Sequence, residues 1–134
     1  MSDAQAFDVV EHESPLPFDT TLESVVQAIV NRGMTIFAKV DHAANARSVG
    51  LSMPPATVVI YGNAKAGTPI MLSAPLAALD LPLRVLVRER EDGKAVIAFH
   101  RITTTLGAVG VAEDAAARLE PAQRMLLSAI TASA

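Results

Sequence analysis

The sequence predicts an α+β fold, a two-layer sandwich with one mixed or antiparallel sheet of four or five strands and helices mainly on one face. Short β-branched or alternating segments have the pattern of strands. Between them, apolar residues recur at the three- and four-residue spacing of amphipathic helices. An Asp92-Gly93 step joins the last two strand-like segments, as in a β-hairpin. Single strands that alternate with helices and end in a hairpin favour one sheet with a helical layer.

Composition limits the class of protein. The 134 residues fit a single domain over 1–134, and a hydrophobic share of 51% supplies a sizeable core. The absence of cysteine excludes disulfides, thiolate nucleophiles and cysteine-bound metals. A net charge of −3 without a basic run argues against a nucleic-acid partner. The N-terminal residues lack the pattern of a signal peptide and no apolar run approaches the ~20 residues of a membrane span, so we expect a cytoplasmic protein without a membrane partner.

The first half of the chain reads as strand, helix, strand and short helix. A strand over 7–13 is followed by Thr20 and Glu23, which fit a capping box, and the helix closes at Gly33. Residues 34–40 alternate, so we expect Met34, Ile36, Ala38 and Val40 to point to one side. Phe37 falls on the otherwise polar side, which favours self-association. A short helix over 43–49 follows.

The second half begins with a β-branched run over 56–61, typical of a strand buried on both faces. The glycine-flanked residues 62–67 indicate a loop, after which Thr68 and Pro69 suit the start of a helix that ends near Pro75. Strands over 83–90 and 95–100 form the hairpin. Residues 102–111 match neither pattern clearly, and a last helix covers about 121–133.

Three segments in order resemble the DUF302 family of small bacterial and archaeal domains. They are Lys-Val-Asp-His-Ala-Ala-Asn-Ala at 39–46, Ile-Tyr-Gly-Asn-Ala-Lys-Ala-Gly-Thr-Pro at 60–69 and Leu-Asp-Leu-Pro-Leu-Arg at 79–84. The similarity is strongest over 7–101. It implies a compact two-layer α/β fold, usually a homodimer, whose biochemical role is unassigned.

The chain also departs from the family pattern. Members commonly have proline where Ala64 stands, and an Asn/Asp-Pro step where this chain has His100 and Arg101. The C-terminal part follows its own pattern, so the resemblance does not fix the geometry of a dimer.

Asp41 and His42 are the first candidate site. A carboxylate beside an imidazole suits acid–base chemistry. Neighbours on a strand point to opposite faces, however, so the two side chains need not meet. The simpler interpretation is that Asp41 caps the following helix at the amide of Ala44, and that His42 is a partly buried, hydrogen-bonded residue.

Residues 62–68 are the second candidate. A turn between a buried strand and a helix start favours anions, because backbone amides and the helix dipole point at it. Lys65 supplies a cation, while Asn63 and Thr68 offer hydrogen bonds. The Lys-Ser/Thr pair of a nucleotide-binding P-loop is missing, so a plain strand–turn–helix connection is the simpler interpretation.

The remaining polar residues give weaker signals. His12, His42 and His100 lack metal-ligand spacing, although His42 and His100 both end strands and could approach one another. Arg84, Arg88 and Arg90 share one side of their strand and suggest a solvated edge or an interface, with Arg84 as an alternative anion ligand.

These patterns lead to one hypothesis and two alternatives. We expect a homodimeric, non-enzymatic domain that binds a small polar or anionic ligand near Asn63, Lys65 and Thr68, with Asp41 and His42 as the opposite wall. One alternative is an enzyme that uses His42 as a general base, and the other is a structural interaction module. The sequence predicts no catalytic residue, no cofactor and no metal site.

Overall fold

A single antiparallel sheet organises the molecule. The computed structural model describes residues 8–132, and its five strands lie in the order β1-β5-β4-β3-β2. They are β1 (Val9–Glu13), β2 (Thr35–Asp41), β3 (Ala56–Gly62), β4 (Leu83–Glu89) and β5 (Ala95–His100). Every neighbouring pair is antiparallel, which confirms the predicted sheet. Phe7, where the first strand was expected to begin, lies outside the described residues, as does residue 133 of the predicted last helix.

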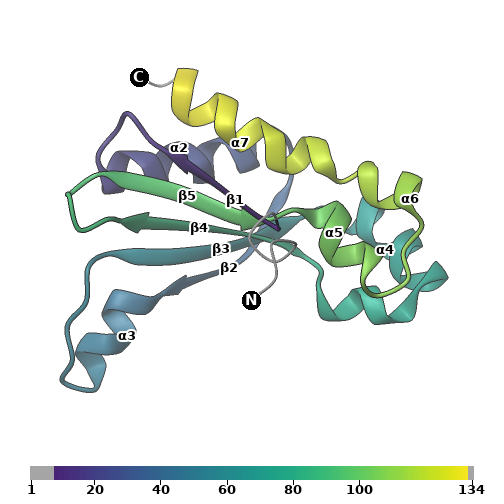
Figure 1. Cartoon of the computed structure of the whole chain (residues 1–134), viewed down its shortest axis with the longest axis horizontal. Coiled ribbons are helices and arrows are strands. Elements are labelled where there is room, and N and C mark those ends of the chain that lie inside the picture. Colours follow the sequence, from purple (N-terminus) through teal and green to yellow (C-terminus); the bar gives the residue numbers. More distant parts are fainter. Residues whose placement is uncertain (1–7, 133–134) are drawn as a thin grey trace.

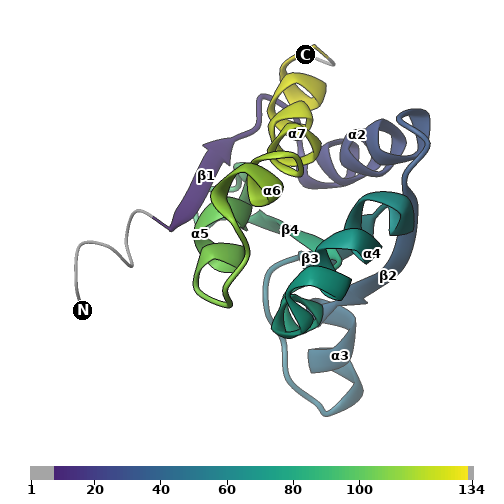
Figure 2. The same cartoon turned by 90° about the vertical axis from the view of Figure 1, so that its right-hand side faces the viewer.

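The helices lie mainly over one face and one end of the sheet (Figure 1). They are α2 (Phe18–Asn31), α3 (His42–Ser48), α4 (Ala64–Ser73), the 3₁₀ helix η1 (Pro75–Leu79), α5 (Ile102–Gly107), α6 (Glu113–Ala117) and α7 (Glu120–Ala132). Helices α2 and α7 lie side by side on one face, and α3 lies on the other (Figures 1 and 2). The two-layer sandwich is therefore confirmed. None of the helices within residues 8–132 is long and apolar enough to span a membrane.

Helix α2 begins three residues earlier than the predicted capping box places it. It starts at Phe18 directly after Pro17, with no capping side chain, so the capping box of Thr20 and Glu23 is wrong. A buried hydroxyl pair holds this end instead: Ser14 and Thr21 hydrogen-bond at 2.7 Å, and Thr21 donates to the Leu16 carbonyl. A tertiary polar contact thus replaces the local cap.

Two glycines with positive φ end elements where the sequence placed them. Gly33 closes α2 at a φ of 74°, and its amide donates to the Val30 carbonyl. Gly93 has a φ of 85° in the β4–β5 hairpin, where its amide donates to the Arg90 carbonyl. A side chain at φ values in this region would be strained, so both positions favour glycine.

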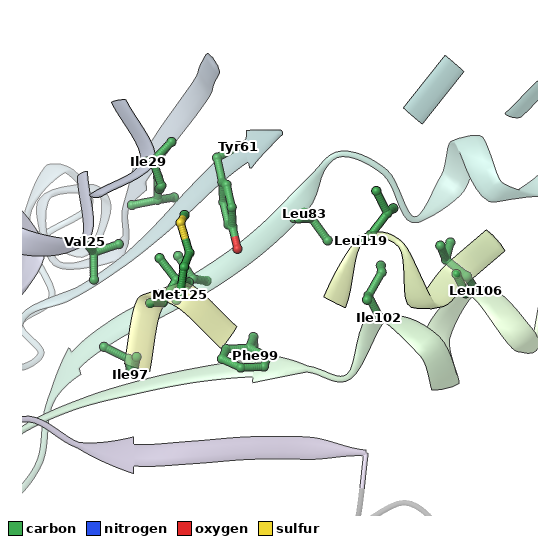
Figure 3. Close-up of a cluster of buried hydrophobic side chains, with 14 of the residues drawn as sticks. Val25, Ile29, Tyr61, Leu83, Ile97, Phe99, Ile102, Leu106, Leu119 and Met125 are labelled. Atoms are coloured by element: carbon green, nitrogen blue, oxygen red, sulfur yellow. The ribbon is translucent and has the colours of Figure 1, made fainter. Parts of the chain in front are cut away.

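The core lies between the sheet and the α2–α7 pair (Figure 3). Directly opposite residues of antiparallel strands share a face, so Tyr61, Val59, Val85, Val87, Ile97 and Phe99 all point toward these helices. Val25 and Ile29 of α2 and Met125 and Leu126 of α7 pack against them. The Tyr61 hydroxyl donates to the Ala122 carbonyl at 2.8 Å, and burial raises the pKa of Tyr61.

The opposite, open face of the sheet has much less cover. Its central side chains, Val58, Ile60 and Leu86, are half-buried, and α3 packs against one corner of this face. The prediction that β3 is buried on both faces is confirmed for its core face. On the open face, β3 is only half-buried.

A bulge at Phe37 breaks the alternation of β2. Ile36 pairs with Tyr61 on the core face, whereas Ala38 pairs with Ile60 on the open face, so the two do not point to one side as expected. Phe37 is the extra residue. Its side chain is 51% exposed, as its place in the pattern indicated.

Candidate functional site

Residues 62–68 are not a loop. Helix α4 begins at Ala64 with Asn63 as its N-cap, so Lys65, Gly67 and Thr68 are helical and Pro69 lies inside the helix. The predicted helix start at Thr68 is therefore wrong. Asn63 caps the helix six residues upstream of Pro69, and the helix continues past the proline, which lacks the amide that would bond the Lys65 carbonyl.

The polar groups at this helix start largely satisfy one another. The Asn63 side chain accepts from the Lys65 amide at 2.9 Å, and its carbonyl accepts from the amides of Ala66 and Gly67. An anion at a helix N-terminus binds through amides that have no other partner. Those of Lys65, Ala66 and Gly67 are already engaged.

A hollow of about 320 Å³, called the α4 hollow below, lies beside this helix. Asn63 and Thr68 line it, but most of the wall is apolar and includes Phe37, Met71 and Leu81. Lys65 is not part of the wall. The three predicted ligand residues of this segment are therefore not gathered around one opening.

Asp41 and His42 lie far from residues 62–68. In the β2–β3 pair, Thr35 is opposite Gly62 and Asp41 is opposite Thr57. Six residues of strand separate the two places, about 20 Å. The expectation that Asp41 and His42 form the opposite wall is wrong for this reason.

Asp41 is a helix cap, as its simpler interpretation held. Its Oδ1 accepts from the Ala44 amide at 2.9 Å at the start of α3. His42 begins α3 with its side chain exposed, so it is not the partly buried residue that was expected.

A second hollow, of about 520 Å³, lies where β4 begins and β5 ends. It is called the sheet-end hollow below. The open face supplies Val58, Leu86 and Ala98, and α5 supplies Thr105. Leu86 is opposite Ala98, and two residues further along these strands are Arg84 and His100, which also line the hollow.

His100 is held in place by Asp8. Its Nδ1 lies 2.8 Å from Asp8 Oδ2, and the Arg101 amide donates to the Asp8 carbonyl at 2.7 Å. An ionised carboxylate only accepts, so the Nδ1 proton points to Asp8 and Nε2 is left for a ligand. The other oxygen, Asp8 Oδ1, is buried without a partner in the described part of the chain.

Two opposite charges in the sheet-end hollow are unpaired. Arg84 is exposed and Asp80, which follows η1, is half-buried. Among the described residues, neither the Arg84 guanidinium nor the Asp80 carboxylate has a hydrogen-bond or ion-pair partner, and they do not pair with each other. Both groups are thus available to a ligand.

A buried glutamine fixes the wall of this hollow. Gln123 of α7 is 3% exposed; it accepts from the Ile102 amide at 3.0 Å and donates to the His100 carbonyl at 2.7 Å. These bonds connect the end of β5, the start of α5 and helix α7. Gln123 lies next to the buried apolar residues of the last helix, such as Met125 and Leu126. A polar residue at such a position is the sequence signal that could have indicated its structural role.

The other arginines of β4 belong to a separate ion-pair cluster at the hairpin. Arg88 pairs with Glu11 at 3.4 Å and Arg90 with Glu13 at 3.0 Å, across β5. Lys94 and Arg90 hold the pKa of Glu13 below its ordinary value. This face is solvated, as expected, but β4 is the central strand and not an edge.

The three histidines do not converge. His42 and His100 end strands β2 and β5, which are three strands apart and end at opposite ends of the sheet, so the expected approach does not occur. Within residues 8–132, no three histidine, aspartate or glutamate side chains gather in a way that could hold a metal.

Known proteins resemble this chain at two levels. A segment of 74 residues, 55% of the chain, is 40% identical to "Fluoride-specific ion channel FluC 1" of Brucella suis biovar 1 (strain 1330), and equally identical to "Fluoride-specific ion channel FluC 2" of Brucella melitensis biotype 1. The matched segment spans only 29% and 27% of those two proteins.

The fold has a counterpart in a crystal structure of an uncharacterized conserved DUF302 protein from Bacillus stearothermophilus. The TM-score is 0.79 at 15% identity, covering 92% of this chain and 96% of the other. Residues 10–132 match the family described as "Domain of unknown function DUF302", so the match continues through the C-terminal helix, beyond the resemblance over 7–101. The chain belongs to the DUF302 family.

Proposed function

We propose that this chain is a cytoplasmic, homodimeric domain that binds a small organic anion in the sheet-end hollow. The observation that carries the proposal is the unpaired guanidinium of Arg84 beside His100, whose ring is held by Asp8. An arginine without an internal partner is free to bind a carboxylate or phosphate through two parallel hydrogen bonds. The volume of about 520 Å³ is within the usual range of small-molecule sites.

This proposal keeps the ligand class expected from the sequence and moves the site. Three first-turn amides of α4 already have partners, and Lys65 is outside the α4 hollow. Residues 62–68 therefore provide few groups that could bind an anion. A ligand in the α4 hollow would be mostly apolar, with Asn63 and Thr68 as its polar contacts. The alternative of an enzyme that uses His42 gains no support, because Asp41 is engaged with the Ala44 amide.

A second copy of the chain would cover the open face. Large apolar side chains are exposed near both ends of the sheet (Figure 1): Val49, Leu51 and Met53 after α3, and Leu72, Leu76 and Leu79 on α4 and η1. Monomeric proteins seldom leave such apolar area uncovered. Sedimentation should give a species of twice the 14.0 kDa chain mass at micromolar concentration. A 14.0 kDa species alone would contradict the dimer.

The ligand site is tested by thermal unfolding with acetate or inorganic phosphate, against chloride at equal ionic strength. Binding to the folded state raises the melting temperature, and the rise grows with the logarithm of the ligand concentration above the dissociation constant. We expect this rise in the wild type and its loss in Arg84→Ala, with the ligand-free melting temperature nearly unchanged.

Lys65→Ala is the matched control, because it removes one exposed cation from the other candidate place. It should keep the full ligand-induced rise. Loss of the rise in Lys65→Ala but not in Arg84→Ala would move the site back to residues 62–68. If acetate or phosphate raised the melting temperature equally in both variants, the rise would be a nonspecific salt effect.

A second candidate function is that of an accessory domain of a fluoride channel. The 40% identity to part of two proteins named as fluoride-specific channels favours it. The domain would then sense or deliver the anion handled by its neighbour. Fluoride should raise the melting temperature more than chloride at equal concentration, and equal effects would count against this function.

A further inference from the structure

Two unpaired charges of opposite sign share the sheet-end hollow. Arg84 stands on β4, and Asp80 follows η1, four residues earlier in the chain. Since the nearest approach of their charged atoms is beyond 4.0 Å, they do not neutralise each other directly. A simple carboxylate in this hollow would be attracted by Arg84 and repelled by Asp80. A ligand that carries both charges would be attracted by both.

Part of the lining of the hollow is aliphatic. Val58, Leu86 and Ala98 come from three adjacent strands of the open face and line the hollow together with the charged groups. Such a surface favours an apolar part of the ligand, at about 25 cal/mol for each Å² removed from water.

We infer that the ligand is a small zwitterion with an aliphatic side chain, of the aliphatic α-amino acid class. Its carboxylate binds Arg84, its ammonium group binds Asp80 and its side chain contacts Val58 and Leu86. His100, oriented by Asp8, supplies Nε2 as a further polar contact. This inference rests on the proposed function, because it assumes the same hollow and the same arginine.

Three probes that share the same isobutyl side chain test the inference. L-leucine carries both charges, 4-methylpentanoate lacks the amine, and 3-methylbutylamine lacks the carboxylate. Calorimetric titration of the wild-type protein should give a dissociation constant for L-leucine at least about tenfold lower than for either single-charge probe, since each charged contact contributes roughly 1.4 kcal/mol or more.

Asp80→Asn separates the contribution of the ammonium group. It should abolish the advantage of L-leucine over 4-methylpentanoate while leaving the affinity for 4-methylpentanoate equal or higher. Asp114→Asn is the matched control: this exposed carboxylate on α6 is not part of the wall, and its loss should leave all three affinities unchanged.

The outcomes distinguish this inference from the proposed function. If 4-methylpentanoate binds as tightly as L-leucine and its binding needs Arg84, the zwitterion is overturned and the anion site stands. The same holds if Asp80→Asn leaves the leucine preference intact. If none of the three probes binds, and acetate and phosphate do not either, both proposals are overturned.

Discussion

The start of α4 and the sheet-end hollow both place a cation near hydrogen-bonding groups, yet they differ in how these groups are used. At the start of α4, Asn63 bonds the Lys65 amide within the same turn, and Lys65 is outside the adjacent hollow. In the sheet-end hollow, the side chains of Arg84 and Asp80 have no hydrogen-bond or ion-pair partner among residues 8–132, and the His100 ring is paired with Asp8.

The difference shows that polar residues whose sequence pattern indicates a ligand site often use their hydrogen-bonding groups within local structure. Asn63 stabilises its own helix, and that role explains its presence without any ligand. The side chains of Arg84 and Asp80 make no such bond within residues 8–132. Stability and ligand binding should therefore depend on different residues, and the following substitutions test that separation.

The largest effect is expected behind the sheet-end hollow. Gln123→Ala removes two hydrogen bonds and leaves the buried amide of Ile102 unsatisfied, at a cost of about 3 kcal/mol in unfolding free energy. Chemical denaturation measures this cost. Gln27→Ala is the matched control, because the Gln27 side chain bonds Asn31 on the exposed side of α2, and its loss should cost less than about 0.5 kcal/mol. Equal costs would mean that Gln123 does not hold the wall.

A smaller effect is expected at the two helix caps. Asn63→Ala and Asp41→Ala should each cost about 1 kcal/mol, because each removes the acceptor of an N-terminal amide. Asn63→Asp and Asp41→Asn should be tolerated, since both residue types cap well. If Asn63→Asp instead abolished acetate binding without a loss of stability, Asn63 would belong to a ligand site after all.

The smallest effect on stability is expected at the charges of the sheet-end hollow. Arg84→Ala and Asp80→Asn should change the unfolding free energy by less than about 0.5 kcal/mol, because neither side chain has a hydrogen-bond or ion-pair partner in the described part of the chain. A loss of unfolding free energy above about 1 kcal/mol in either variant would mean that the residue stabilises the fold. It would contradict the contrast drawn between the sheet-end hollow and the start of α4.

The sequence predicted most of the fold because periodicity and turn chemistry are local. The antiparallel sheet, the end of α2 at Gly33 and the Asp92-Gly93 hairpin all followed from nearby residues. The errors arose where a longer-range or competing contact decided the outcome. The buried Ser14–Thr21 pair takes the place of the predicted cap of α2. Helix α4 is capped by Asn63 and not, as predicted, by Thr68.

The site was harder to predict because its parts are distant in the chain. Asp8 and His100 are 92 positions apart and meet only because β1 pairs with β5. Arg84 was recognised as an alternative anion ligand, but nothing in its neighbourhood indicated His100 as its companion. The prediction that joined Asp41 to Asn63 failed because the β2–β3 register places them at opposite ends of the strands.

The most direct test of the account is an acetate titration followed in the ¹H–¹⁵N NMR spectrum of the wild-type protein. Binding in the sheet-end hollow predicts that saturable shifts concentrate at the amides of Asp80, Arg84, His100 and Thr105, and that residues 64–68 barely respond. Shifts concentrated at residues 64–68, or spread evenly without saturation, would contradict the account.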